Sequence, residues 1–383
     1  MREGCIGNCL ACGKCGSFAI LDGFSAGSRH FKPRSGYGIA VDIGTSSVVL
    51  ALADLQTSDI IARHSFMNPQ RAFGADVISR ISAANDGQLE ALRHAITQSI
   101  AAGVQALLAS REIDPKLVRD MAVAGNTTMI YLLLGFPCAS LGVSPFKPAF
   151  VAAESYGYSD LFDSPPIQCP VRIIPWLSAF VGGDITAGLL HVRQDNCNRF
   201  LLIDLGTNGE MALYDNGKLT ITSTAAGPAF EGGGHSGGAS AVISDLPALI
   251  RDGFVDETGY LAEEAPPAFT QKEIRELQLA KSAVRTGLEI LLEPIGYEAL
   301  DAVYLAGGIG QAMHVDSAVE IGLLPAALKD KVRAVGNASL GGAVYVLATQ
   351  ENAKTLYGDL TEINLASHPR FNDYFMDYMS FEG

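Results

Sequence analysis

The sequence predicts an α/β protein that contains two copies of one domain, and three observations point to this fold. Strand-like runs alternate with long helical segments, which is typical of α/β architectures. The pattern Asp-x-Gly-Thr occurs at Asp42 and again at Asp204, a repeat distance of about 160 residues that suits paired domains. The 383 residues suffice for two or three domains of about 150 residues each. We therefore expect two domains that face each other across a cleft.

Each copy begins with a strand, a polar turn and a returning strand. In the first copy these are residues 39–41, 42–47 and 48–53, and in the second they are 200–203, 204–210 and 211–214. A further buried strand at 121–124 is followed by a helix for which Asn126 or Thr127 is the expected N-cap.

Two long helices and two glycine-rich segments complete the pattern. Apolar periodicity predicts a helix over 88–110, and Thr270 with Glu273 forms a capping box that begins a second helix. A strand at 302–305 runs into the glycine-rich segment 306–310, and Gly341-Gly342-Ala343 leads a last helix.

The composition excludes several classes of protein. Hydrophobic residues make up 48%, which argues against intrinsic disorder, and the net charge of −14 argues against a nucleic-acid or anionic-membrane surface. No apolar run reaches the 18 or so residues of a membrane helix, and the N-terminus has no signal-peptide core. We expect a soluble, cytoplasmic protein.

The two Asp-x-Gly-Thr turns have the chemistry of phosphate loops. Glycine lets the backbone approach a ligand, and successive N–H groups and the threonine hydroxyl donate to phosphate oxygens. The aspartate would hold Mg²⁺ rather than the phosphate itself. A single such turn is more often an ordinary hairpin turn. Two aligned copies, together with Ala306-Gly307-Gly308 after a third strand, favour nucleotide binding.

These segments resemble the superfamily of acetate and sugar kinases, heat-shock chaperones and actin, in which two ribonuclease-H-like domains close on ATP. The resemblance covers about residues 38 to 350. It implies a first phosphate loop at 42–46, a second at 204–210 and an adenosine loop at 306–310, with connecting segments at 124–127 and 341–343. We expect a cysteine-rich segment and connector at 1–37, a first domain at 38–197 and a second domain with the C-terminal tail at 198–383.

Four cysteines, Cys5, Cys9, Cys12 and Cys15, lie within eleven residues near the N-terminus. Their C-x3-C-x2-C-x2-C spacing favours one iron–sulfur cluster of the 4Fe–4S type, with a tetrahedral zinc site or incidental cysteines as the alternatives. Cys138, Cys169 and Cys197 are scattered, and we expect them to be small buried hydrophobic residues or bystanders.

An iron–sulfur segment before this fold resembles the ATP-dependent reductive activators of corrinoid enzymes. The segments that carry the resemblance are 68–80, 124–129, 178–184, 204–210, 226–232 and 368–375. Relatives often carry an N-terminal ferredoxin-like domain with a 2Fe–2S cluster, where this sequence has its short cysteine segment. After Glu231-Gly232 the sequence continues as Gly-Gly-His-Ser-Gly-Gly, whereas relatives tend to have a Ser-Cys-Gly-like stretch.

The resemblance implies an activity and its partners. Such activators reduce an inactive Co(II) corrinoid to Co(I) in anaerobic methyl-transfer metabolism, and they use ATP to drive the electron transfer. We therefore expect ATP and Mg²⁺ as cofactors, a corrinoid protein as partner, a low-potential ferredoxin or flavodoxin as electron donor, and a possible homodimer. ATP binding would favour a closed domain pair that docks the corrinoid protein, and hydrolysis would reset it.

The same resemblance assigns roles to residues. Asp42 and Asp204 are expected to organise Mg²⁺, and Glu210, Asn126, Thr127 or Asp184 to position the attacking water. Asp184 serves equally well as a cap of the helix that follows it. The expected nucleotide-binding residues are Gly44, Thr45, Ser46, Gly206, Thr207, Asn208, Gly227, Gly307 and Gly308.

Three other functions remain open. A small-molecule kinase of this fold needs no cluster. An activator of a 2-hydroxyacyl-CoA dehydratase would share a cluster between subunits, with fewer cysteines in each chain. A nucleotide-switched binding protein would hold structural zinc in its cysteine segment, without redox chemistry.

Overall fold

Two six-stranded sheets organise the part of the chain that the structure describes. The computed structural model describes residues 31–152, 155–193, 197–206, 208–230, 239–266 and 269–381. These form two compact units. The first unit holds the described residues up to 193 together with the segment Asn337–Leu356, and the second holds those from 197 to 336 together with those from Tyr357 on.

The strand order of the first sheet is β3-β2-β1-β4-β6-β5, and that of the second is β11-β10-β7-β8-β9-β12. The strands are β1 (Tyr37–Ile43), β2 (Ser47–Asp54), β3 (Ile60–Met67), β4 (Val118–Gly125), β5 (Ser155–Gly157), β6 (Pro170–Ile173), β7 (Arg199–Leu205), β8 (Asn208–Asp215), β9 (Lys218–Ala225), β10 (Ala302–Ala306), β11 (Val332–Gly336) and β12 (Asp359–Glu362).

Both sheets share one topology. β1, β2 and β3 form an antiparallel meander, and β4 and β6 extend the sheet in parallel from β1. β7, β8 and β9 repeat the meander, and β10 and β11 repeat the parallel extension from β7. The edge strands differ, since β5 is antiparallel to β6 and β12 is parallel to β9. The repeated topology confirms the predicted α/β duplication.

The longer helices agree with the sequence pattern. The helices are α2 (Val77–Ala83), α3 (Leu89–Ser110), α4 (Thr127–Leu134), α5 (Ala139–Gly142), α6 (Tyr158–Leu161), α7 (Gly183–Val192), α8 (Ala239–Arg251), α9 (Gln271–Leu292), α10 (Gly307–Ala312), α11 (Val315–Glu320), α12 (Ala338–Thr349) and α13 (Phe371–Asp377). The predicted helix at 88–110 is α3, and the predicted capping box of Thr270 and Glu273 begins α9. No helix in the described ranges is both long enough and apolar enough to cross a membrane.

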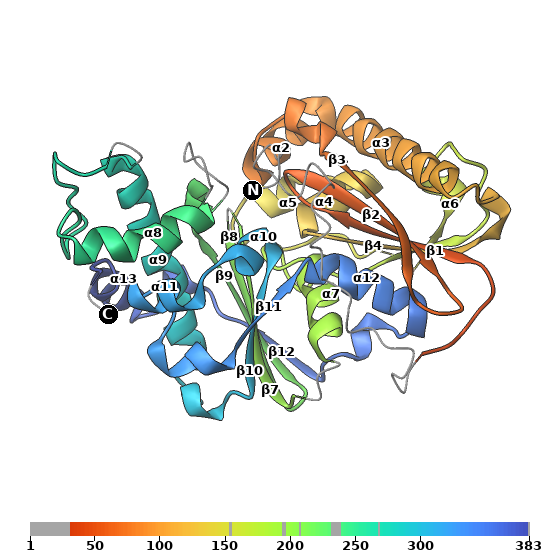
Figure 1. Cartoon of the computed structure of the whole chain (residues 1–383). Coiled ribbons are helices and arrows are strands. Elements are labelled where there is room, and N and C mark those ends of the chain that lie inside the picture. Colours follow the sequence, from red (N-terminus) through yellow and green to blue (C-terminus); the bar gives the residue numbers. More distant parts are fainter. Residues whose placement is uncertain are drawn as a thin grey trace. The chain divides into compact units, whose positions relative to one another are not determined.

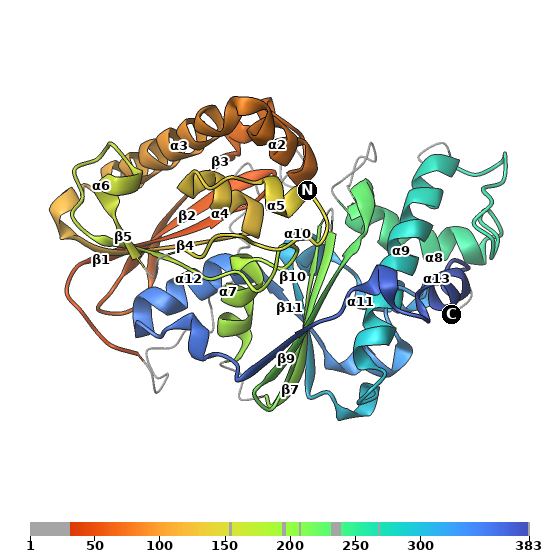
Figure 2. The ribbon, with the colours of Figure 1, turned by 180° about the vertical axis from the view of Figure 1, so that it is seen from behind.

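The first sheet is covered on both faces (Figures 1 and 2). Alternate side chains of β1, including Ile39 and Val41, share a hydrophobic core with Leu92 and Ile96 of α3. On the opposite face, Gly38 of β1 packs against Leu347 of α12. The core of the first unit therefore depends on a helix that the chain supplies only after it has built most of the second unit.

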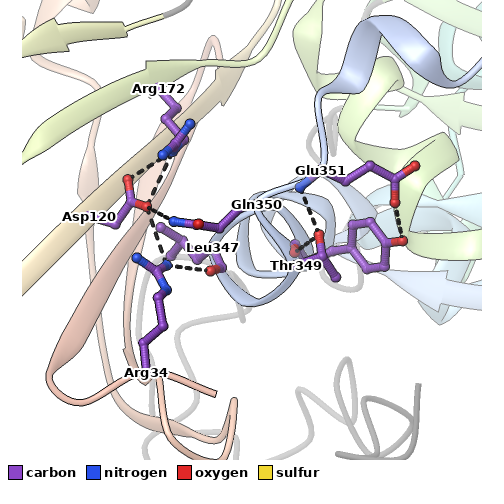
Figure 3. Close-up of polar contacts among 8 residues, drawn as sticks. Arg34, Asp120, Arg172, Leu347, Thr349, Gln350 and Glu351 are labelled. Carbon is purple, nitrogen blue, oxygen red and sulfur yellow. Dashed lines mark hydrogen bonds and ion pairs between the residues drawn. The ribbon is translucent and has the colours of Figure 1, made fainter. Parts of the chain in front are cut away.

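Polar contacts hold the C-terminal end of α12 on the sheet (Figure 3). The Asp120 carboxylate on β4 is buried and accepts hydrogen bonds from Arg172 Nε at 3.0 Å and Gln350 Nε2 at 3.4 Å. Arg34 donates to the same carboxylate at 3.3 Å and to the Leu347 carbonyl at 2.8 Å. A buried carboxylate between two guanidinium groups is strongly destabilised when one partner is removed, because a charge is then left unpaired.

Two glycines let α12 approach α7 closely. A Cβ at Gly342 would overlap the Ala187 carbonyl of α7, and a Cβ at Gly341 would lie 2.7 Å from the His191 ring. Backbone cannot yield as a side chain can, so Gly342 is the position where only hydrogen fits.

Gly342→Ala is therefore expected to destabilise the first unit, although alanine favours helix by about 1 kcal/mol relative to glycine. Overpacking costs about 1–3 kcal/mol and exceeds that gain. Thermal unfolding of the variant should show a lower midpoint than wild type. Gly341→Ala is the matched control in the same helix. Its unfolding midpoint should fall by less, because the His191 ring can turn. Equal midpoints for Gly342→Ala and wild type would contradict this packing.

Candidate functional site

The first candidate site lies at one edge of the first sheet. Ile43 of β1 pairs with Val48 of β2 and with Gly125 of β4. The register therefore brings the turn between β1 and β2, here called loop 44–46, to the same edge as the end of β4. The Gly44 amide closes the turn by donating to the Ser47 carbonyl at 3.0 Å.

The carbonyls of loop 44–46 are held by groups that sequence reasoning did not assign. Asn68 Nδ2 donates to the Gly44 carbonyl at 2.8 Å, and the Asn68 amide donates to the Ser46 carbonyl at 3.0 Å. Arg80 Nη2 donates to the Thr45 carbonyl at 2.7 Å. Asn68 and Arg80 are both buried, so these contacts are shielded from water.

Asp42, the last polar residue before this loop, is bound at both carboxylate oxygens. Asn337 Nδ2 donates to Oδ2 and Ser339 Oγ donates to Oδ1, each at 2.7 Å. Asn337 also caps α12, since its Oδ1 accepts from the Leu340 amide at 2.7 Å. Burial raises the pKa of Asp42, and the hydrogen bonds from Ser339 and Asn337 oppose that rise. The N-terminal end of α12 is thus attached to β1 through Asp42.

Asn126 joins loop 44–46 to α4. Its Oδ1 accepts from the Met129 amide at 3.0 Å, which confirms the predicted N-cap, and its Nδ2 donates to Thr45 Oγ1 at 3.1 Å. The neighbouring Thr127 is buried, and its hydroxyl donates to the Ser178 carbonyl at 2.6 Å. Because its hydroxyl is buried and already hydrogen-bonded, Thr127 is not exposed to a ligand.

Asp184 lies beside Asn126 because Gly182 has no side chain. A Cβ at Gly182 would overlap the Asn126 Cα and would lie 2.7 Å from Asp184 Oδ1, so only glycine fits there. The N-cap of α7 is Gly182, so Asp184 is not the helix cap that the sequence allowed. Asp184 lies in the first turn of α7, where its Oδ1 accepts from the Ile185 amide at 2.9 Å. The structure thus brings Asp42, Thr45, Asn126 and Asp184 to one edge of the first sheet.

The second unit repeats this arrangement. Asp204 of β7 lies directly opposite Glu210 of β8, and the Gly206 amide donates to the Asn208 carbonyl at 2.9 Å. Asp204 also pairs with Ala306 of β10, which precedes Gly307. These contacts place the second phosphate-type turn beside the start of α10.

Glycines around Asp204 make room for close approach. Gly307 has φ +78°, and a Cβ there would lie 2.6 Å from Asp204 Oδ1. Gly308 follows it in the first turn of α10. Gly227, with φ +73°, comes two residues after Ala225, which pairs with Asn208. Gly206, Asn208, Gly227 and Gly307 therefore share one edge of the second sheet, and Thr207 lies outside the described residues.

The predicted cluster ligands Cys5, Cys9, Cys12 and Cys15 also lie outside the described residues. Cys138 and Cys169 are buried, and burial raises the pKa of their thiols to about 11 and about 12, which disfavours the thiolate that binds metal. Within the ranges that the structure describes, no three His, Cys, Asp or Glu side chains are grouped to hold a metal ion. A Mg²⁺ ion bound with a nucleotide needs only one or two carboxylates, because phosphates and waters complete its shell.

Sequence reasoning missed four polar residues of the first site: Asn68, Arg80, Asn337 and Ser339. Asn68 and Arg80 begin and end a segment that carries the family resemblance. The resemblance marked the segment but assigned no role to either residue. Asn337 precedes a predicted helix and could have been found as its N-cap. Its contact with Asp42 spans 295 residues of sequence and has no local signal.

Family models match nearly the whole described chain. A model described as "RACo middle region" matches residues 37–196, and one described as "C-terminal domain of RACo the ASKHA domain" matches 198–248 and 251–383.

Curated relatives and a solved structure agree with these models. "Corrinoid activation enzyme RamQ" of Eubacterium limosum is 32% identical over 89% of this chain and 69% of its own length. "[Co(II) methylated amine-specific corrinoid protein] reductase" of Methanosarcina barkeri is 24% identical over 90% of this chain and 77% of its own length. The solved structure titled "Reductive activator for corrinoid,iron-sulfur protein" has a TM-score of 0.78 and 29% identity, covering 91% of this chain and 66% of that one. The chain therefore belongs to the RACo family of reductive activators of corrinoid proteins.

Proposed function

We propose that this chain activates a corrinoid protein by ATP-dependent reduction of its cobalt from Co(II) to Co(I). The observation that carries the proposal is the match along 89% of the chain to a relative named as a corrinoid activation enzyme. The two repeated Asp-x-Gly turns support the ATP requirement, because each unit presents one at a sheet edge beside further glycines.

Each unit supplies its own nucleotide-binding residues. In the first unit, loop 44–46 would bind phosphate oxygens through Gly44, Thr45 and Ser46. In the second unit, Gly206, Thr207 and Asn208 would do the same, and Gly227, Gly307 and Gly308 would admit the nucleotide close to the backbone. Asp42 and Asp204 would hold Mg²⁺. The site of Asp42 fits this ion, because two hydrogen bonds orient its half-buried carboxylate. A Mg²⁺ ion beside it would stabilise the charged form that burial disfavours.

The attacking water would be positioned by Glu210 or Asp184. Glu210 is directly opposite Asp204 in the second sheet, and Asp184 is beside Asn126 in the first unit. Asn126 acts through Thr45, because its amide group is engaged by Thr45 Oγ1 and by the Met129 amide. Its role is therefore to orient the loop.

The electron would reach cobalt through the N-terminal cysteine segment. Cys5, Cys9, Cys12 and Cys15 would hold one iron–sulfur cluster, of 4Fe–4S type, which supplies a single electron. A low-potential ferredoxin or flavodoxin would reload the cluster, and the corrinoid protein would accept the electron. ATP can drive this transfer only to the extent that it binds two states of the protein with different affinity.

Replacing Asp204 tests the coupling of ATP to reduction. Asp204→Asn keeps the shape of the side chain but removes the charge that would hold Mg²⁺, so ATP turnover and corrinoid reduction are both expected to fall at least about tenfold. The two rates are measured on the same preparation, and Asp316→Asn, at an exposed carboxylate of the second unit, is the matched control. Full corrinoid reduction without ATP turnover would contradict the coupled mechanism.

The metal content tests the redox step. Protein purified without oxygen should carry about four irons and four acid-labile sulfides per chain, and Cys9→Ser with Cys12→Ser should abolish both. Cys138→Ala, at a buried thiol, should leave the iron content unchanged. One zinc and no sulfide would exclude electron transfer through this segment and favour the nucleotide-switched binding protein.

The residues that hold Asp42 should set the Mg²⁺ requirement. Asn337→Ala and Ser339→Ala each remove one donor from the carboxylate, at a cost of about 1–3 kcal/mol for a half-buried charged group. We expect each variant to need several-fold more Mg²⁺ for half-maximal binding of ADP, measured by calorimetry. Asn352→Ala also loses a helix cap in the first unit but does not touch Asp42, so its Mg²⁺ requirement should match wild type. An unchanged Mg²⁺ requirement in both Asp42-contact variants would remove Asp42 from the metal site.

A further inference from the structure

The segment 68–80 carries the family resemblance, but nothing so far gives it a function. It follows β3 directly and contains a short helical turn at Pro69–Ala72 and the helix α2. Its first and last residues, Asn68 and Arg80, are 1% and 0% exposed. Polar side chains are rarely buried so completely without partners that the fold requires. Both residues have partners in loop 44–46.

Arg80 holds the middle of the loop with a buried positive charge. Its Nη2 donates to the Thr45 carbonyl at 2.7 Å and its Nε to the Gly74 carbonyl at 3.0 Å. Its Nη1 lies 3.2 Å from the Met129 sulfur. Arg80 therefore acts here as a donor of directed hydrogen bonds, one of which fixes the Thr45 carbonyl. Its charge also interacts with the carboxylate of Asp76, the N-cap of α2.

Asn68 holds the two ends of the loop. Its side-chain amide donates to the Gly44 carbonyl and its backbone amide donates to the Ser46 carbonyl. Its Oδ1 accepts from the Gln70 amide at 2.9 Å, and Gln70 Nε2 donates to the Leu92 carbonyl of α3 at 3.0 Å. Gln70 therefore connects Asn68 to α3 and holds it in place beside the loop.

The three carbonyl contacts decide where the loop amides point. In a planar trans peptide the C=O of one residue and the N–H of the next point in opposite directions. Because the carbonyls of Gly44, Thr45 and Ser46 all point toward segment 68–80, the amides of Thr45, Ser46 and Ser47 point away from it. Successive amides on one side of a turn form an anion-binding surface.

We propose that Asn68 and Arg80 are positioning residues that fix loop 44–46 as a phosphate-binding loop. Neither residue touches the ligand. Asn68 and Arg80 hold the carbonyls of the loop toward segment 68–80, so that its amides face the anion on the other side. The inference rests on the proposed function in one respect, which is that the anion belongs to a nucleotide.

The test is calorimetric titration of Mg-ATP and of adenosine, which lacks phosphate. Arg80→Met keeps much of the side-chain volume but removes the charge and the donors, and we expect Mg-ATP affinity to fall about 10- to 100-fold while adenosine affinity is unchanged. Arg80→Lys retains the charge with fewer directed donors, and its Mg-ATP affinity should lie between those of Arg80→Met and wild type. Arg71→Met is the matched control, because Arg71 lies in the same segment but is exposed.

Asn68→Ser provides a second, milder variant in case Arg80→Met does not fold. Serine can still cap the turn at Gln70 but is too short to reach the Gly44 carbonyl, so Mg-ATP affinity should fall by less than with Arg80→Met and adenosine affinity should again be unchanged. Thermal unfolding monitors the fold of every variant.

The outcomes separate this inference from the proposed function. If wild type binds Mg-ATP and the folded Arg80 and Asn68 variants bind it equally well, the positioning role is wrong while the nucleotide function stands. If Mg-ATP and adenosine lose affinity in equal proportion, the segment supports the unit as a whole and not the phosphate loop. If wild type binds no Mg-ATP, the proposed nucleotide function fails first, and this inference fails with it.

Discussion

The attachment of α12 to the first sheet is the constraint on which the rest of the first unit depends. At its N-terminal end, Asn337 and Ser339 bind Asp42 of β1, and at its C-terminal end Gln350 binds Asp120 of β4. Between these ends α12 packs against α7 through glycine. The same helix therefore completes the hydrophobic core and orients a carboxylate of the candidate site. A movement of α12 would therefore disturb the packing on β1 and displace the Asp42 carboxylate at the same time.

The two units use different means to shape equivalent turns. In the second unit Gly307 lies against the Asp204 side chain beside the turn after β7, and a Cβ at Gly307 would be 2.6 Å from Asp204 Oδ1. In the first unit the turn after β1 is held by side chains from segment 68–80. Among the described residues, the two turns thus occupy equivalent positions in their sheets and have different neighbours.

Local patterns in the sequence predicted much of the fold. The repeat of Asp42 and Asp204 predicted the duplicated α/β unit, and both sheets share a meander with a parallel extension. Asn126 and Thr270 cap the helices that they were expected to cap. These features depend on neighbours within a few residues. The contacts that orient the first site do not, since Arg80 lies 35 residues from Thr45 and Asn337 lies 295 residues from Asp42. Propensity and periodicity carry no information about such pairs, and only the folded chain brings them together.

The late position of α12 in the sequence has a consequence for how the protein is made. A chain that grows from its N-terminus usually folds its first domain first. Here every strand of the first sheet precedes residue 174, but the helix that covers one face of that sheet begins at Ala338. During synthesis the ribosome must deliver β7 to β11 before the first unit can bury that face. The nascent protein therefore exposes apolar surface until α12 has been synthesised, and the first unit completes its folding only when most strands of the second unit already exist.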